Sequence, residues 1–499
     1  MTDLNDKEGI QMSTRTQETG LETRSIDFIP EQERHGKVWH LGPMWFAVNA
    51  NLTILATGVF GLMYGANLFW SFVAALLGVS VGTFFMAFHS AQGPQLGMPQ
   101  MLQSRAQFGY RGALIVVPGV LVMYLGYNIV NTQLAAEATN VIVDQVVGQS
   151  VNAELLYVLM LALVFVVALV GYTLIHAIQR VLTVLFLMVF GVLTVGAVLI
   201  VDLPEGSFDP GSGFVWLAFL AQFSVAAASQ MGWAPYVADY SRYLPSKVGV
   251  RATFWWTYLG SMTGAIWMMW LGALTTAAAG VDTGPVVAVR EAAEGIFPGF
   301  GIPVMLVAVP GLLSVTVVNT YCAGLTLITV MDSIKPLRPT LRHRVFVILL
   351  VVTVVFLGAT YGSSNFLEMF QNLILIMLYC FVPWTAINLL DFYTVRRGEY
   401  EISEMFKPAG IYGQWNWRGL VAYVASLTAM VPFFSIGEWF TGPIAESIGG
   451  IDIAMFIGLP VSGILYLVFN RYWPAAGVRQ KKGKPGAKAG DGFLADQGV

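Results

Sequence analysis

Twelve mostly apolar stretches, each long enough to cross a lipid bilayer as a helix, are the strongest constraint on how this chain folds. A transmembrane helix needs about 20 such residues and satisfies its own backbone polar groups in hydrocarbon, so we expect an all-α integral membrane protein. The composition agrees, because only 11% of the residues are charged, whereas soluble domains usually carry about 25%. The expected spans are 43–64, 67–88, 113–137, 154–173, 181–201, 214–238, 252–279, 301–330, 345–361, 366–390, 418–437 and 453–470.

Lysine and arginine residues gather in alternate loops. They occur in residues 1–42, in the loops after the second, fourth, sixth, eighth and tenth spans, and in the tail 471–499, with Arg290 as the exception. Because basic residues stay on the cytoplasmic side, we expect a plasma or inner membrane protein with both termini in the cytoplasm. Residues 1–42 lack the apolar core of a signal peptide. The Gly-, Lys- and Pro-containing tail is interpreted as a disordered cytoplasmic segment rather than a nucleic-acid site.

The sixth span is interrupted by Gly232 and Pro235. A proline removes a helical donor, and the freed backbone is tolerated at membrane depth only where it lines a protein cavity. Transporters built from inverted repeats hold their substrate between discontinuous helices at equivalent positions of the two halves. The sixth span begins a second five-span half, so its partner is the first span, which carries Asn51, Thr53 and Thr57 among its apolar residues. Polar residues of this kind indicate a cavity, although small ones also serve close helix packing.

Enzyme signatures are missing from the sequence. The five histidines form no His-Glu-x-x-His pattern, and there is no Gly-x-Ser-x-Gly or nucleotide-binding Gly-x-x-x-x-Gly-Lys motif. Cys322 and Cys380 lie in apolar spans and support neither a disulfide framework nor a zinc site. We therefore expect a transporter that is not an enzyme and needs no cofactor or metal centre. A passive channel or facilitator for a small polar solute is the alternative, but its pore would need a continuous polar lining, whereas the polar residues here cluster at one depth.

Three segments carry a resemblance to a known family. They are Gly93–Gly109 (GPQLGMPQMLQSRAQFG), Trp233 with Pro235-Tyr236 and Asp239-Tyr240, and Pro383–Tyr393 (PWTAINLLDFY). Together they resemble the nucleobase:cation symporter family, the purine-cytosine permeases and hydantoin carriers. The resemblance implies a five-plus-five inverted repeat of the leucine-transporter type, with helices one and six discontinuous. The repeats would cover 43–201 and 214–390, followed by two further helices in 418–470.

The resemblance also implies a substrate site. A planar heterocycle would lie between Tyr127, where the family usually has tryptophan, and Trp233, beside the exposed backbone of Gly232. The amides of Asn131 and Asn319 would read its edge. Tyr127 and Asn131 are four residues apart, so they share a helix face. Stacking contributes about 1–3 kcal/mol per base, and an amide can pair with a base edge in a bidentate way. The alternatives are that Tyr127 is a packing aromatic and Asn319 an interhelical hydrogen bond. Asn51 and Thr53 complete the predicted substrate-binding set.

A coupling cation is the second expected ligand. Sodium-coupled relatives carry two adjacent hydroxyl residues on helix eight, whereas this chain has Leu313 and Ser314. Ser314, Thr57 and Gly311 would form a cation site with one ligand too few, so a proton is favoured over sodium. The titratable residues available for a proton route are Glu137, Glu368, Asp239 and Asp391. Of these, the two aspartates are expected to pair with Arg242 and with Arg396 or Arg397, or to cap helices.

The predicted function is import of a nucleobase, such as cytosine or a purine, by alternating access. Spans one, two, six and seven would form a bundle that rocks against a scaffold of spans three, four, eight and nine. Helix ten would act as a thin gate, with Gln371 and Asn372 in it. Allantoin, hydantoin and vitamin precursors share the flat ring and remain alternatives. The expected partners are this heterocycle, the cation and the lipid bilayer, with a monomer as the working assumption and no nucleic acid.

Overall fold

The structure is a computed structural model that describes residues 28–474, except 171, 336, 338–339 and 363–365. Most of the N-terminal tail expected at 1–42, namely residues 1–27, lies outside the described residues. Residues 475–499 of the expected C-terminal tail lie outside them as well.

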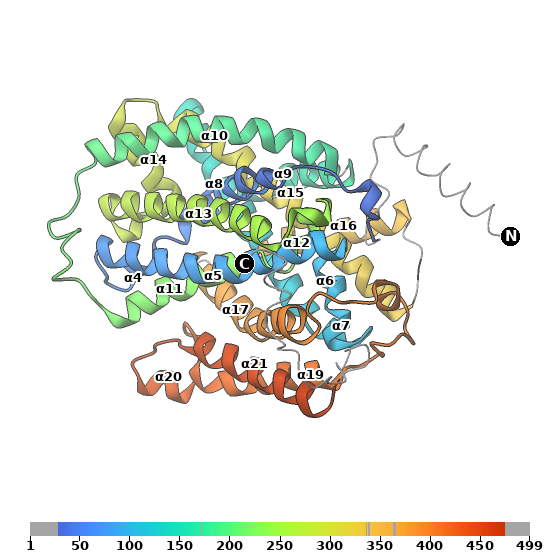
Figure 1. The fold of residues 1–499 in the computed structure, drawn as a ribbon. Coiled ribbons are helices and arrows are strands. Elements are labelled where there is room, and N and C mark those ends of the chain that lie inside the picture. The colour runs from blue at the N-terminus through green and yellow to red at the C-terminus, as the bar shows by residue number, and fades with distance from the viewer. Residues whose placement is uncertain (1–27, 171, 336, 338–339, 363–365, 475–499) are drawn as a thin grey trace.

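Long helices take up most of the apolar stretches (Figure 1). They are α5 (Leu68–Leu96), α8 (Val117–Val147), α9 (Ala153–Val170), α10 (Tyr172–Ile200), α13 (Val250–Ala279), α15 (Gly301–Ile334), α16 (Leu341–Tyr361), α17 (Phe366–Leu390), α19 (Trp417–Met430) and α21 (Ala454–Tyr472). Within the described residues, eight helices are long and apolar enough to cross a membrane, or nine with one bent pair counted as a single span. The other predicted spans correspond to α8, which mixes amides into its apolar sequence, to the broken sixth span and to the short α19.

The first and sixth spans are both broken. The first span divides into α2 (Leu41–Asn49), α3 (Leu52–Ala56) and α4 (Phe60–Met63), with a bend of 62° between its two halves. At the bend Asn51 is extended and caps α3 by accepting a hydrogen bond from the Ile54 N–H at 3.0 Å. The sixth span divides into α11 (Trp216–Met231) and α12 (Val237–Ser241), which flank Gly232–Tyr236. Both predicted discontinuities are therefore present.

Glycines allow the helices of spans one, two, six and seven to pack closely in one bundle. α5 packs along α11, α12 and α13, and α13 packs along α2 and α3. A Cβ on Gly82 of α5 would lie 2.2 Å from the Ala227 carbonyl oxygen of α11, and a Cβ on Gly260 of α13 would lie 2.2 Å from that of Gly42. These distances leave no room for a side chain, so small residues set the close approach of the helices.

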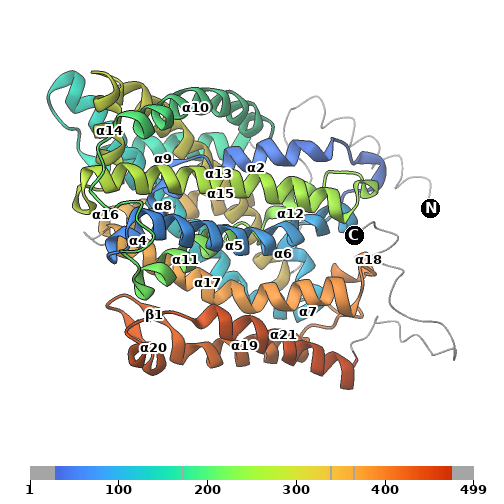
Figure 2. The same cartoon turned by 60° about the vertical axis from the view of Figure 1, so that its left-hand side comes forward.

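The helices of spans three, four, eight and nine form a second group, because α8, α9, α15 and α16 all contact one another. α17 packs against α8 of this group, against α11 of the bundle, and against α19 and α21. In Figures 1 and 2 the pair α19 and α21 lies below α17, far from α10 at the top. Helix ten, α17, thus lies between the bundle, the second group and the pair formed by α19 and α21.

Short elements cover the two faces of the molecule (Figure 2). One face, called here the terminus face, carries η1 (Glu31–Glu33), η2 (Val38–His40), α6 (Gln100–Gln103), α7 (Arg105–Phe108), η3 (Gly112–Ile115), η4 (Ser246–Val248), the π-helical turn η6 (Asp391–Val395) and α18 (Ile402–Met405). The other, the hairpin face, carries η5 (Val281–Thr283), α14 (Pro285–Ile296), η7 (Val431–Phe433), α20 (Pro443–Ser447) and the antiparallel strands β1 (Ser435–Ile436) and β2 (Phe440–Thr441). α14 was not expected from the sequence, because its short amphipathic pattern does not resemble a span.

Candidate functional site

Trp233 lies in the break of the sixth span and is 6% exposed. Its indole N–H donates to Asn49 Oδ1 at 3.2 Å, across to the last residue of α2. Its ring meets the rings of Trp45 and Tyr236 edge to face, with centroid distances of 5.9 and 5.5 Å. The indole therefore points into the protein, where the two broken spans meet.

Asn49 holds this indole within a buried amide and hydroxyl network. Its Oδ1 also accepts from Gln230 Nε2 at 3.0 Å, and its Nδ2 donates to Ser261 Oγ at 2.9 Å and to the Trp45 carbonyl at 2.8 Å. Gln230 Oε1 in turn accepts from Ser261 Oγ at 2.8 Å. The hydrogen-bonding capacity of Asn49 is fully used, so its side chain fixes Trp233 relative to α2, α11 and α13.

Asn131 and Thr53, predicted from separate spans, meet in the structure. The Thr53 hydroxyl of α3 donates to Asn131 Oδ1 of α8. No partner among the described residues reaches the buried Asn131 Nδ2. Asn51 is placed differently, because its amide donates to the Val48 carbonyl and accepts from Ile54 N–H. In this conformation Asn51 holds the break, while Asn131 keeps a free donor.

The two predicted stacking residues contact different rings. Tyr127 lies edge to face against Phe370 of α17, at a centroid distance of 6.2 Å, and its buried hydroxyl has no hydrogen-bond partner among the described residues. Tyr124 of α8 instead approaches Tyr236, at 5.2 Å. The Tyr236 hydroxyl donates to Asn319 Oδ1 at 3.3 Å, which brings the predicted amide of helix eight to the break of the sixth span.

The space around Trp233 is closed in this conformation. It encloses about 10 Å³, between residues that include Trp45, Trp233, Tyr236 and Val318. Gly232 lines the same break, and a Cβ there would lie 3.3 Å from the Ser229 carbonyl oxygen. A heterocycle would therefore enter only after the aromatic side chains separate.

A larger cavity of about 590 Å³ lies between α2, α10 and α15. It follows α2 from Trp39 and His40 on the terminus face to Ala50 at the break. Two of the predicted cation-site residues, Gly311 and Ser314, line it. The third, Thr57, is buried elsewhere, and its hydroxyl donates to the Ile54 carbonyl at 2.6 Å. The structure thus brings two of the three together at this cavity.

The predicted gate residues face the first span and the hairpin. Gln371 Oε1 accepts from the Tyr64 hydroxyl at 2.8 Å, so the hairpin-face ends of spans one and ten touch. Asn372 is buried and faces the hairpin turn, where a Cβ on Gly437 would lie 3.0 Å from its Oδ1. With the Tyr64–Gln371 contact closed, the large cavity lies on the terminus-face side of the breaks.

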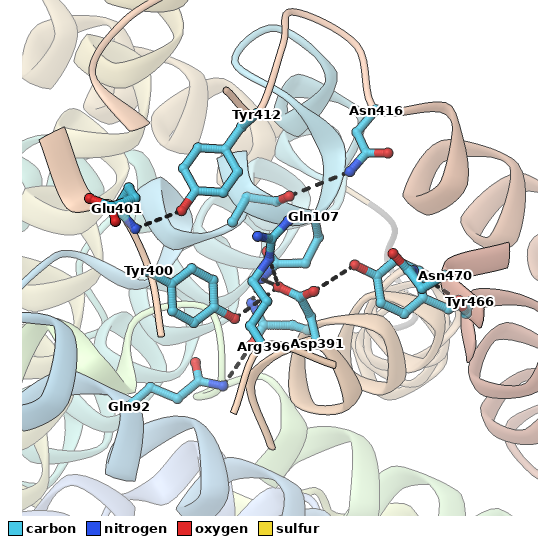
Figure 3. Close-up of polar contacts among 12 residues, drawn as sticks. Gln92, Gln107, Asp391, Arg396, Tyr400, Glu401, Tyr412, Asn416, Tyr466 and Asn470 are labelled. Carbon is cyan, nitrogen blue, oxygen red and sulfur yellow. Dashed lines mark hydrogen bonds and ion pairs between the residues drawn. The ribbon is translucent and has the colours of Figure 1, made fainter. Parts of the chain in front are cut away.

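The titratable residues considered for a proton route lie apart from one another. Asp391 forms the expected ion pair with Arg396 at 3.1 Å, and Gln107 and Tyr466 also donate to it (Figure 3). Asp239 accepts from the Gln100 backbone N–H at 2.7 Å. Glu137 is exposed on α8, and Glu368 lies beside the hairpin turn at Gly437. None of these four carboxyl groups lines either of the two cavities.

Sequence reasoning missed several residues that organise the site. Asn49, Gln230, Tyr236 and Tyr64 all make the buried contacts given above. Gln222 Nε2 also donates to the Thr57 carbonyl at 2.9 Å, and its Oε1 accepts from Gly61 N–H. Gln222 and Gln230 are eight residues apart, which places both on one face of α11. Two amides at this spacing within an apolar span could have been recognised in the sequence as a polar face of the helix.

Comparisons with known proteins identify the family of this chain. A family described as "Permease for cytosine/purines, uracil, thiamine, allantoin" matches residues 28–458. The chain is 38% identical to YxlA of Bacillus subtilis, a provisionally named purine-cytosine permease, over 92% of this chain and 99% of that one. It is 24% identical to the purine-cytosine permease fcyB of Emericella nidulans, over 91% of this chain and 89% of that one.

Solved structures show the same fold. Mhp1, a nucleobase-cation-symport-1 family transporter, in a closed conformation with bromovinylhydantoin bound, matches with a TM-score of 0.71 at 18% identity, over 91% of this chain and 96% of that one. The inward-facing conformation of Mhp1 matches equally well. The predicted fold, an all-α membrane protein of the leucine-transporter type, is confirmed. Because the matched relatives are permeases, the chain is a multi-pass membrane transporter and not an enzyme.

Proposed function

Because the chain belongs to the family of permeases for cytosine and purines, uracil, thiamine and allantoin, we propose that it imports a nucleobase by cation-coupled alternating access. Cytosine or a purine is the proposed substrate. Allantoin, a hydantoin or a vitamin precursor would present a similar flat ring, and these are the second choice.

The meeting of the two broken spans at Trp233 is the observation that carries the proposal. The indole offers a stacking face, while Tyr127 Oη and Asn131 Nδ2 are buried polar atoms without a partner among the described residues. Buried polar groups are rarely left unpaired, because each costs about 1–3 kcal/mol. The edge of a heterocycle would satisfy both atoms once the aromatic side chains separate.

The proposed route of release follows the 590 Å³ cavity between α2, α10 and α15. The basic residues of the alternate loops support a cytoplasmic terminus face, so this cavity would open inward. The contact between Tyr64 and Gln371 would then close the outer side. In this proposal the bundle of α2–α5 and α11–α13 rocks against α8, α9, α15 and α16, with α17 as the thin gate.

For the coupling ion we favour a proton over sodium. Ser314 and Gly311 line the cavity, but Leu313 has no side-chain oxygen, and Thr57 does not line the cavity. Sodium needs several oxygen ligands. Accumulation of labelled substrate in sodium and in choline buffers, with and without a protonophore, distinguishes the two ions. Equal uptake that never exceeds the outside concentration would indicate the alternative, a passive facilitator.

Uptake of radiolabelled cytosine, adenine and guanine into cells expressing the chain tests the site. Trp233→Ala and Asn319→Ala should each lower uptake by about 5- to 150-fold, since a stacking contact or an edge contact is worth about 1–3 kcal/mol. Trp216→Ala is the matched control, because this indole lies on the exposed surface of α11 and should leave uptake unchanged. Unchanged uptake in both site variants would exclude this site.

A double-mutant cycle tests whether Asn49 acts through the indole. Trp233→Phe keeps an aromatic face but removes the N–H that Asn49 accepts. Asn49→Ala should raise the KM for the transported base in the wild-type background and raise it by a smaller factor when Trp233 is already Phe. Equal factors in the two backgrounds would show that Asn49 supports the bundle without positioning Trp233.

A further inference from the structure

Helix ten has a weak point at Pro383, inside α17. Proline has no backbone N–H, so it cannot donate to the carbonyl of Tyr379 four residues earlier. Sharp bends in helices usually occur at such residues. The segment from Phe366 to Tyr379, which carries Gln371 and Asn372, can therefore move relative to the remainder of α17.

A buried carboxylate lies at this weak point. Asp452, just before α21, is 8% exposed and accepts a hydrogen bond from the Tyr379 hydroxyl. The same oxygen accepts from Ser435 N–H of β1 at 2.9 Å, and its other oxygen accepts from Ala454 N–H at 3.1 Å. Phe434 stacks on the Tyr379 ring, with centroids 3.7 Å apart. Asp452 therefore joins α17, the hairpin and the start of α21 in one contact, called here the Asp452 clamp.

The hairpin also touches α17 nearer to its end on the hairpin face. Gly437 in the turn lies against Asn372, and a Cβ there would also be 3.4 Å from Glu368 Oε1. The strands β1 and β2 thus follow the part of α17 on the hairpin-face side of Pro383. If this part of the helix moves, either the hairpin moves with it or the Asp452 clamp opens.

The donors to Asp452 are all neutral, being one phenol and two backbone N–H groups. Burial raises the pKa of Asp452 to about 6, although these hydrogen bonds oppose the shift. The other charged or titratable groups on the packed elements are Glu368, Tyr379 and Cys380 on α17, Glu438 in the hairpin turn, Glu446 on α20, and Tyr466, Arg471 and Tyr472 on α21. Glu438 and Glu446 are exposed, and the basic residue Arg471 lies in the last turn of α21, at the opposite end of that helix from Asp452. Among the described residues of these elements, no cation therefore lies close enough to Asp452 to stabilise its charged form.

We propose that Asp452 is a proton-binding site on the hairpin face, and that proton uptake there stabilises the closed position of helix ten. A carboxyl group that is buried when the clamp is closed and hydrated when it is open binds its proton more tightly in the closed state. Acid on this face therefore favours closure, and neutral pH favours opening.

This site is distinct from the coupling site of the proposed function. Asp452 lines neither cavity and is reached from the hairpin face, so its proton is taken up and released on one side of the membrane. The inference needs no particular substrate or coupling ion. It goes beyond the proposed function by assigning a pH response to the gate itself.

The test measures the distance across the gate in purified, substrate-free protein by pulsed electron–electron double resonance. Spin labels at Met63 of α4, which is exposed, and at the partly exposed Leu367, near the hairpin-face end of α17, report the separation of spans one and ten. Cys322 and Cys380 are replaced by alanine. The pKa of Asp452 is about 6 in the closed state and has an ordinary value in the open state. The ratio of closed to open molecules should therefore rise about tenfold from pH 8 to pH 5.

Three variants decide the outcome. Asp452→Asn should remove the pH response, because it has no carboxyl to titrate. Tyr379→Phe keeps the ring that stacks on Phe434 but removes a hydrogen bond to the carboxylate, so the midpoint should move to higher pH. Glu438→Gln, at an exposed carboxylate of the same hairpin, should respond like the wild type. A wild-type distance independent of pH, an unchanged response in Asp452→Asn or an unshifted midpoint in Tyr379→Phe would overturn the proposal. Because no substrate is present, these outcomes do not depend on the proposed transport activity.

Discussion

Two buried carboxylates anchor helix ten, Asp391 directly after its last residue and Asp452 through Tyr379 on the hairpin-face side of Pro383, and they differ in their partners. Asp391 on the terminus face is fully buried and accepts hydrogen bonds from Arg396, Gln107, Tyr400 and Tyr466 (Figure 3). Asp452 on the hairpin face accepts only from neutral groups. A guanidinium compensates the charge of the first carboxylate, whereas the second can lose its charge by taking up a proton. One anchor is an ion pair with Arg396, and the other carboxylate is held by neutral donors alone.

The two parts of α17 on either side of Pro383 also differ in the helices and loops that they contact. On the terminus-face side, Trp384 stacks on His89 of α5 at 4.6 Å, and Asn388 accepts from Gln92 of the same helix at 2.8 Å. On the hairpin-face side, α17 contacts Tyr64 of span one, the hairpin and, through Phe370, Tyr127 of α8. The difference indicates that the terminus-face part of helix ten stays with the bundle, while the other part is the movable gate.

The largest expected effect comes from breaking the fixed anchor. Asp391→Ala leaves the Arg396 guanidinium buried without its counter-ion, which typically costs about 3–5 kcal/mol. The melting temperature of the purified protein should fall sharply. Asp332→Ala is the matched control, because Asp332 pairs with the buried Arg105 but is itself partly exposed, and Arg105 keeps the Met405 carbonyl and Ser333. Similar losses in the two variants would mean that the Asp391 anchor is no stronger than a partly hydrated ion pair.

The second effect depends on pH. The pKa of Asp452 is raised to about 6 from an ordinary 3.8, so its contribution to folding stability is complete below pH 4 and is lost as the pH rises towards 6. The loss is on the order of 3 kcal/mol. Melting temperatures measured from pH 4.5 to 7.5 should therefore fall more steeply in the wild type than in Asp452→Asn. Glu446→Gln, at an exposed carboxylate of α20, should follow the wild-type curve. Parallel curves for wild type and Asp452→Asn would contradict the raised pKa.

The sequence predicts features that depend on neighbouring residues. The length of the apolar stretches indicates the spans, and the missing N–H of Pro235 indicates the break that places Trp233. Thr53 of the first span and Asn131 of the third were both predicted to bind the substrate, and the two side chains meet. The capping use of Asn51 was also open to prediction, because asparagine is a preferred first residue of a helix.

Contacts that join distant segments were not predictable in this way. Asn49 satisfies its amide only when α2, α11 and α13 are packed together. Asp452 lies in a loop with no local motif, and its burial depends on Tyr379, which is 73 residues away. The edge contact of Tyr127 with Phe370 likewise reflects one arrangement of helix ten that no spacing encodes. Such residues emerge only from the three-dimensional arrangement.

The smallest expected effects compare two tyrosine hydroxyls that donate to these carboxylates. A hydrogen bond to a charged group is worth about 1.5–3 kcal/mol, and one between neutral groups about 1 kcal/mol. Tyr466→Phe should therefore cost the same at pH 5 and pH 8, because Arg396 keeps its charge throughout and compensates Asp391. Tyr379→Phe should cost more at pH 8 than at pH 5, because Asp452 takes up a proton between them. Melting temperatures of both variants at the two pH values provide the measurement. If the cost of Tyr379→Phe were also independent of pH, Asp452 would be a fixed anchor like Asp391, and the distinction between the two ends of helix ten would fail.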